Sequence, residues 1–256
     1  MFSVIICSID ARRFADVEAM YRRLFQDHPW ELIHIDDARS LAEGYTRGVA
    51  ASSGDKLIFS HDDIDIFSPD MPRRLERHLS DFDIVGVAGT SLLQYAAWLW
   101  SGPPFIFGQV AAPTDSGKIR VNIFGAPYPV ICGIQAIDGL FMAVRRSVFP
   151  RISFDPVTFD GFHLYDVDFS YSAFRAGLGL AVVNDICIYH ASGGKYDEIW
   201  KHYAKSFEEK WFVGQPIPPP RPMRWSGVSV ANRMEALEVM TPPFWRQNPE
   251  NRSDCR

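Results

Sequence analysis

Short apolar runs alternate with amphipathic segments over residues 1–90, and this alternation constrains the fold more than any other feature. The runs are rich in Val and Ile, which is typical of buried strands. They lie at residues 2–9, 31–35, 56–60 and 83–88. The segments between them repeat apolar side chains at helical spacing. They lie at residues 14–25, 41–54 and 68–79. This order predicts an α/β fold with a mostly parallel sheet flanked by helices.

Two of these predicted helices carry start signals. Ser40 followed by Glu43 is a capping box, and Gly54 predicts the end of that helix. Ser68 followed by Pro69 predicts the cap and the first position of the next helix.

The chain changes character after residue 90. Residues 119–124, 129–137 and 178–189 resemble strands, whereas aromatic side chains at helical spacing predict two further helices, one ending at Gly177 and one over 196–211. We therefore expect one domain over 1–212, with a nucleotide-binding half (1–90) and an acceptor half (91–212). A proline-rich extension follows over 213–256.

Composition excludes several classes of protein. The net charge of −5 argues against a nucleic-acid binder. No uncharged run reaches the roughly 18 residues that span a bilayer, and no basic segment precedes the first apolar run. The cysteines, Cys7, Cys132, Cys187 and Cys255, lie far apart. They predict reduced thiols and a cytoplasmic location rather than a disulfide framework.

Four ionisable side chains, His61, Asp62, Asp63 and Asp65, directly follow the third predicted strand. Ligands bind at the carboxyl ends of strands in open α/β sheets. Crowded carboxylates repel one another unless a cation offsets their charge, and oxygen ligands with one imidazole suit Mn²⁺ or Mg²⁺. The alternative is a solvated turn or a helix cap.

Further acidic side chains follow the first two predicted strands. Asp36 and Asp37 end the second strand and Asp10 follows the first. A carboxylate there can accept hydrogen bonds from a ribose or a base, or it can cap the next helix.

A second acidic group lies about a hundred residues later in the chain. It comprises Asp155, Asp160, His163, Asp166 and Asp168. Asp166 lies near a predicted helix start, where it can act as a general base or as a cap. His190 ends an apolar run before Gly193 and Gly194. A lone histidine is usually structural, but this position makes His190 a better ligand candidate than most, and Lys195 can meet a phosphate.

Several catalytic motifs are missing from the sequence. It contains no phosphate-binding G-x-x-x-x-G-K-[ST], no G-x-G-x-x-G after the first strand and no G-x-S-x-G. Nucleotide hydrolases of the P-loop type, dinucleotide enzymes and serine hydrolases of the α/β type are therefore disfavoured.

The order of the remaining motifs resembles the family-2-type glycosyltransferases of the GT-A fold. More narrowly, it resembles the bacterial glycosyltransferase-like subgroup with His-x-Asp in place of Asp-x-Asp. The resemblance covers residues 1–212 and rests on 5–8, 35–37, 41–48, 59–63, 138–146, 162–168 and 189–190. It implies a small antiparallel sheet on the acceptor side.

The resemblance also implies roles for individual residues. A nucleotide-sugar donor, with a UDP-sugar as our guess, would contact Ser8, Asp10, Asp36, Asp37, Arg47, Asp62, Asp138, Gly139 and Lys195. Mn²⁺ or Mg²⁺ would be held by Asp63 and His190, with His61 and Asp65 as further candidates. Asp166 would be the base that activates the hydroxyl of a glycan, lipid-linked or protein acceptor.

Two residues depart from the family pattern. His61 replaces a carboxylate, and Tyr165 stands where a Glu commonly precedes the catalytic Asp. A late Gln-x-x-Arg-Trp is missing, so we expect a non-processive, inverting hexosyltransferase of bacterial surface glycan or glycoconjugate synthesis. A non-catalytic nucleotide-sugar or glycan-binding module and a metal-dependent phosphohydrolase using His61 and Asp62 are the alternatives.

Two segments rich in aromatic side chains allow more than one interpretation. Residues 95–107 can form an acceptor platform or ordinary core. Arg221, Arg224 and Trp225 can contact the surface of a membrane, at the inner face if the protein is cytoplasmic.

Overall fold

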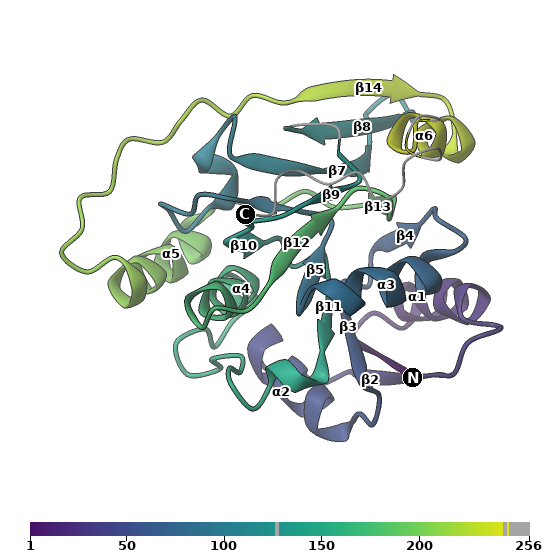
Figure 1. Cartoon of the computed structure of the whole chain (residues 1–256), viewed down its shortest axis with the longest axis horizontal. Helices are drawn as coiled ribbons and strands as arrows, with labels where there is room; N and C mark the ends of the chain where they lie inside the picture. Colours follow the sequence, from purple (N-terminus) through teal and green to yellow (C-terminus); the bar gives the residue numbers. More distant parts are fainter. Residues whose placement is uncertain (126–127, 243–244, 246–256) are drawn as a thin grey trace.

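Two mixed β-sheets form the centre of the molecule (Figure 1). The computed structural model describes residues 1–125, 128–242 and 245. The first sheet has the strand order β2 (Trp30–Ile35), β1 (Phe2–Cys7), β3 (Lys56–Ser60), β11 (Phe141–Arg145), β5 (Ile84–Gly86), β12 (Leu180–Val183), β9 (Val130–Ile131). The second has the order β10 (Ala136–Ile137), β6 (Ala88–Thr90), β7 (Ile106–Pro113), β13 (Ile188–His190), β4 (Ile64–Ile66). On this second sheet β8 (Ile119–Phe124) pairs with β7, and β14 (Ser226–Val230) pairs with β8.

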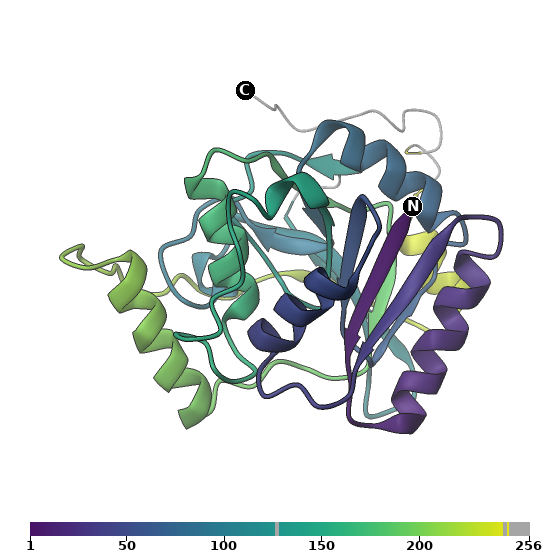
Figure 2. The same cartoon turned by 90° about the horizontal axis from the view of Figure 1, so that it is seen from below.

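Helices cover both faces of the first sheet, which confirms the predicted α/β class. The helices of the described residues are α1 (Ala11–Leu24), α2 (Leu41–Ala51), α3 (Met71–Asp81), α4 (Tyr165–Arg175), α5 (Glu198–Trp211) and α6 (Arg233–Met240), with short 3₁₀ turns η1 (Trp98–Ser101) and η2 (Arg146–Val148). Apolar side chains of α1 and α3 pack on one face, and those of α2 and α4 pack on the other. Figure 2 shows α1 and α2 on opposite sides of β1 and β2.

Strands β1, β3 and β11 of the first sheet bring residues from distant segments to one edge of that sheet. Strands β1 and β3 run parallel, so the residues that follow them emerge at one edge. Strand β11 is antiparallel to both of its neighbours, so the residues before it start from that same edge. Phe141 to Val144 are fully buried, and an apolar run of this kind does not reveal its direction from sequence.

Three predicted strands divide between the two sheets. The runs at 83–88, 129–137 and 178–189 each contribute one short strand to the first sheet and another to the second. Each run was expected to be continuous, because buried apolar residues occupy both halves and periodicity alone cannot mark the bend.

The helix starts are partly as expected. Ser40 caps α2 by accepting the Glu43 N–H at 3.0 Å, as the capping box predicts. Asp70, not Ser68, precedes α3. The prediction for Ser68 is wrong because its buried hydroxyl instead bonds the Asp185 carbonyl and the Cys187 N–H.

Residues after α5 pack back onto the second sheet. An extended segment leads from α5 to β14, which lies beside β8 with α6 at its end (Figure 1). Trp225 donates to Asn122 and Arg221 lies 4.5 Å over the Phe105 ring, so two of the three side chains of the expected membrane patch have partners within the fold. Predictions for residues 243–244 and 246–256 lie outside the described residues.

The cysteines differ from expectation at one position. Cys7 and Cys187 are free thiols, but Cys132 is disulfide-bonded. The prediction of reduced thiols throughout is therefore wrong, because distant spacing in the sequence does not exclude proximity in the fold. Among the described residues, no helix combines the length and apolarity that crossing a bilayer requires.

Candidate active site

The site begins where β1 and β3 end. The Ser8 hydroxyl donates to the Asp62 carboxylate at 2.6 Å. The Arg13 guanidinium of α1 lies 3.9 Å from the other oxygen of the same carboxylate. Asp62 is therefore oriented by two elements that meet at the carboxyl edge of the sheet, as parallel pairing of β1 and β3 requires.

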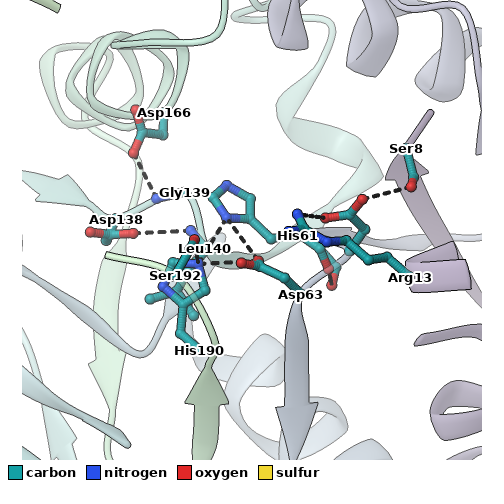
Figure 3. Close-up of polar contacts among 12 residues, drawn as sticks. Ser8, Arg13, His61, Asp63, Asp138, Gly139, Leu140, Asp166, His190 and Ser192 are labelled. Atoms are coloured by element: carbon teal, nitrogen blue, oxygen red, sulfur yellow. Dashed lines mark hydrogen bonds and ion pairs between the residues drawn. The ribbon is translucent and has the colours of Figure 1, made fainter. Parts of the chain in front are cut away.

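Three side chains converge beside Asp62. His61 and Asp63 follow β3, and His190 ends β13 (Figure 3). His190 Nε2 lies 3.2 Å from Asp63 Oδ1 and 3.3 Å from His61 Nδ1, and His61 Nδ1 lies 3.9 Å from Asp63 Oδ1. The strand pairing of β4 with β13, extended by the Ala191 N–H bond to the Asp63 carbonyl, holds His190 against Asp63.

The arrangement fits a divalent cation. Ligand oxygens lie about 2.1 Å from an octahedral ion such as Mg²⁺, so adjacent ligands lie roughly 3 Å apart. The separations in the cluster are close to that value, and the three ligand atoms lie within 4.8 Å of one another. Two imidazoles and one carboxylate form a more nitrogen-rich set than the sequence suggested, which favours Mn²⁺ over Mg²⁺.

Electrostatics favour the metal-binding form of Asp63 and His61, whereas the hydrogen bond and charge of Asp63 raise the pKa of His190 despite its burial. Burial raises the pKa of Asp63, but hydrogen bonds from His190 and Ser192 outweigh it and hold that pKa below its usual range. Burial and the neighbouring His190 lower the pKa of His61. A charged carboxylate and a neutral imidazole are the forms that a metal ion requires.

A second carboxylate pair faces the cluster. Asp166, near the start of α4, accepts the Gly139 N–H at 2.7 Å (Figure 3). Asp138 accepts the Leu140 N–H at 3.0 Å and the Trp98 indole N–H at 2.9 Å. Leu164, which precedes α4, has φ of +63°, and this local strain sets the direction in which the helix presents its first residues.

The environment of Asp166 suits a proton acceptor. Removal from water and the charge of Asp138 raise the pKa of Asp166 to about 7. A general base works best when its pKa lies near the operating pH. Asp166 accepts a hydrogen bond from the neutral backbone N–H of Gly139 rather than from a cationic side chain. The carboxylate therefore keeps a lone pair with which it can take a proton.

Two cavities meet at this cluster. One of about 320 Å³ is lined by Ser8, Arg13, Asp62 and Asp63 among others. The other, of about 630 Å³, is lined by His61, His190, Asp138 and Asp166, and its far wall carries Trp98 and Tyr196. His61 and Ser192 line both, so the candidate ligand cluster lies where the two cavities meet.

Not every predicted site residue reaches these cavities. Asp10 caps α1 through the N–H groups of Arg12 and Arg13. Asp36 is exposed, and Asp37 forms an ion pair with Arg47, which also pairs with Glu43. Asp10, Asp36, Asp37 and Arg47 do not line either of the two cavities.

Asp65 lies outside the ligand cluster. Its carboxylate is 2.8 Å from Arg233 of α6 and 3.8 Å from Arg23 of α1. It lines another cavity, together with Asp63 and the arginines Arg23 and Arg233. Asp65 therefore pairs with cationic side chains instead of joining the His61, Asp63 and His190 cluster.

The other acidic residues near 160 have structural partners. Asp168 is buried and bonds Lys210 and Trp211, which fastens α5 to α4. Asp160 accepts the Tyr203 hydroxyl. Lys195, by contrast, lines the larger cavity, as does His163.

Three residues at the site were not singled out from sequence as site residues. Arg13 looks like an ordinary solvated helix residue, and Ser192 looks like part of a flexible loop. Tyr165 was noted only as a departure from a pattern, although its hydroxyl lies 2.9 Å from His61 Nε2. The sequence did offer a signal for Arg13, because this arginine lies in the first turn of the helix that follows the first strand.

Comparison with known proteins gives one extended match. Residues 3–211 match the family described as Glycosyltransferase like family. This match confirms the family resemblance found in the motifs. No curated protein sequence gives a significant match.

Solved structures resemble the chain at low identity. The mannosyltransferase PcManGT from Pyrobaculum calidifontis, in complex with GDP-Man and Mn²⁺, is 14% identical with a TM-score of 0.49, covering 86% of this chain and 66% of that one. GalNAc-T7 with UDP, GalNAc and Mn²⁺ is 14% identical with a TM-score of 0.45, covering 84% and 48%. A197 from STIV is 12% identical with a TM-score of 0.44, covering 75% and 86%. The chain thus spans just under two thirds of the mannosyltransferase and about half of GalNAc-T7.

Proposed function

We infer the reaction from the premise that this chain belongs to the glycosyltransferase-like family. We propose that it transfers a sugar from a nucleotide-diphosphate sugar to a hydroxyl acceptor in a single inverting displacement. The donor would occupy the cavity of about 320 Å³ and the acceptor the cavity of about 630 Å³.

One observation supports this proposal above the others. The larger cavity is lined both by His61 and His190 of the candidate metal cluster and by Asp166. A displacement at an anomeric carbon needs a stabilised leaving group at one end and a base at the other. The chain supplies both within one continuous space.

Each residue then has a defined task. His61, Asp63 and His190 would hold a divalent cation, which neutralises the charge that develops on the leaving diphosphate. Arg13 offers a second positive charge at the mouth of the donor cavity. Asp166 accepts the proton of the attacking hydroxyl, while the Gly139 N–H fixes the orientation of its carboxylate.

The acceptor side is aromatic. Trp98, Tyr196 and Trp200 line the larger cavity, and Phe162 lies 57% exposed at the rim that both cavities share. Flat apolar faces suit stacking against a sugar ring. We propose a glycan or glycoconjugate acceptor on this basis, with Trp98 fixed by its bond to Asp138.

The finer assignments are further proposals. They are a hexosyl donor, UDP as its nucleotide, Mn²⁺ as the preferred cation, non-processive transfer and a role in bacterial surface glycan synthesis. The cytoplasmic location expected from the cysteines also remains a proposal, and the disulfide at Cys132 removes one of its grounds. Cell fractionation tests it.

A nucleotide panel tests the proposed reaction. Thermal shifts with UDP, GDP and their sugars are measured with and without Mn²⁺, followed by donor hydrolysis and transfer assays on any nucleotide that binds. We expect Mn²⁺-dependent stabilisation by one nucleoside diphosphate and release of that diphosphate from its sugar. Binding without turnover in the presence of acceptor glycans would identify a non-catalytic module. Phosphate release from nucleotides that lack a sugar would identify a phosphohydrolase.

A further inference from the structure

We propose that Tyr165 is a positioning residue that sets the tautomer of His61 and thereby keeps Nδ1 free to bind the cation. The inference rests on the proposed function, because it concerns the same metal cluster. It starts from a contact across two elements, between the Tyr165 hydroxyl at the start of α4 and His61 Nε2 after β3, at 2.9 Å.

The two nitrogens of His61 face different surroundings. Nδ1 points into the cluster, 3.3 Å from His190 Nε2 and 3.9 Å from Asp63 Oδ1. Nε2 points the other way, toward Tyr165. A neutral imidazole carries one proton, so the proton must be on Nε2 if Nδ1 is to offer its lone pair to a cation.

The Tyr165 hydroxyl oxygen can accept a hydrogen bond from His61 Nε2–H because the hydroxyl proton is directed to a different acceptor. The hydroxyl donates to the Gly139 carbonyl oxygen at 3.4 Å. A chain then runs from His61 Nε2–H to the tyrosine oxygen and from the tyrosine O–H to the backbone of Gly139. This backbone belongs to the same residue whose N–H orients Asp166, so one turn supports both halves of the site.

Water does not easily replace the hydroxyl. Tyr165 is 4% exposed and packs edge-on against Tyr45. A Cβ on Gly139 would come within 2.3 Å of the hydroxyl oxygen, so little space remains around it. Without this hydroxyl a proton on Nε2 would be buried without a partner, which costs on the order of 1–3 kcal/mol.

Removal of the hydroxyl therefore favours the opposite tautomer. The proton would then be on Nδ1, the nitrogen that faces His190 and Asp63 inside the cluster. A protonated Nδ1 has no lone pair to offer a cation. Partners that orient metal-binding histidines are typically worth about 10–100-fold in metal affinity.

The test compares Tyr165→Phe with the unaltered full chain in Mn²⁺ binding, measured by electron paramagnetic resonance without nucleotide. We expect affinity to fall by about 10–100-fold. Tyr171→Phe is the matched control, since Tyr171 is a buried tyrosine of the same helix that packs on Trp211 and lines neither cavity. It should leave Mn²⁺ affinity unchanged. Equal affinities for Tyr165→Phe and the unaltered chain would overturn the inference.

A double-mutant cycle tests whether Tyr165 affects Mn²⁺ affinity through His61 or through a general disturbance of the structure. In a His61→Asp background the imidazole is gone, so adding Tyr165→Phe should change Mn²⁺ affinity by less than about threefold. A further large loss would assign Tyr165 a role that does not pass through His61.

A second measurement uses the unaltered chain and so does not depend on the folding of a variant. The ¹⁵N shifts of the His61 ring in the metal-free chain report which nitrogen carries the proton. We expect an unprotonated Nδ1 and a protonated Nε2, and the reverse pattern would overturn the inference. If the unaltered chain binds no Mn²⁺ while His61 shows the expected tautomer, the proposed metal-dependent reaction fails and the positioning contact stands.

Discussion

Asp63 and Asp166 are the same kind of side chain at two ends of one cleft, and their surroundings push them in opposite directions. Asp63 lies beside two imidazoles and Ser192, which hold its pKa below the usual range despite burial. Asp166 lies beside Asp138 and has no cationic partner among the described residues, and burial with the charge of Asp138 raises its pKa to about 7. Groups with pKa values driven apart in this way commonly divide the work of a reaction. Here one end is suited to hold a permanent negative charge and the other to accept a proton.

Replacing Asp63 tests the charged end and should have the largest effect. Asp63→Ala removes the only carboxylate of the three-residue cluster. The stabilisation that a cation gives to a leaving diphosphate is worth several kcal/mol. We expect transfer to fall roughly 10⁴-fold, with Mn²⁺ affinity lost in calorimetry. Retained Mn²⁺ affinity would show that the cluster is not the metal site.

Replacing Asp166 tests the proton-accepting end. Asp166→Asn keeps an oxygen that can accept the Gly139 N–H but cannot take a proton from a hydroxyl. General bases contribute roughly 10²–10⁴-fold, so kcat should fall within that range. Mn²⁺ affinity should stay within about twofold, since Asp166 is not part of the cluster. A parallel loss of metal binding would remove the distinction between the two ends.

The pH profile sharpens the same distinction. Because Asp166 must be ionised to act as a base, kcat/KM at saturating Mn²⁺ should fall about tenfold for each pH unit below about 7. Asp138→Asn removes a negative charge that raises the pKa of Asp166. This variant should therefore move the acidic limb of the pH profile, where kcat/KM falls, to lower pH. An unshifted limb in Asp138→Asn would assign the titration to another group.

Stability gives the smallest effect and an independent check of the pKa. The folded chain holds the proton of Asp166 up to about pH 7, whereas an unfolded chain releases it near the ordinary value of 3.8. The folded state therefore binds more protons between these values, and stability falls as pH rises through that window. Asp166→Asn should raise the melting temperature by on the order of 5 °C at pH 8 and leave it nearly unchanged at pH 4. An equal change at both pH values would contradict the raised pKa.

The sequence indicated candidate residues at both ends of the cleft but not the contacts that they make. Asp63 and His190 stood out because each follows or ends a buried strand, and parallel sheets gather ligands at that edge. Their separation of 3.2 Å depends on the antiparallel pairing of β13 with β4, two strands more than 120 residues apart. Nothing in either local segment encodes that pairing.

The amino-acid sequence by itself determined the succession of strands and helices, the capping of α2 by Ser40, and the residue types that can bind a cation or accept a proton. These features depend on neighbours within a few residues. Tertiary structure alone decided that Asp65 pairs with Arg233 from α6 while Asp63 faces two histidines, and that Tyr165 meets His61. The physical reason is that a carboxylate or an imidazole takes its charge state and its ligand role from whichever groups the chain packs against it, and those groups come from distant segments.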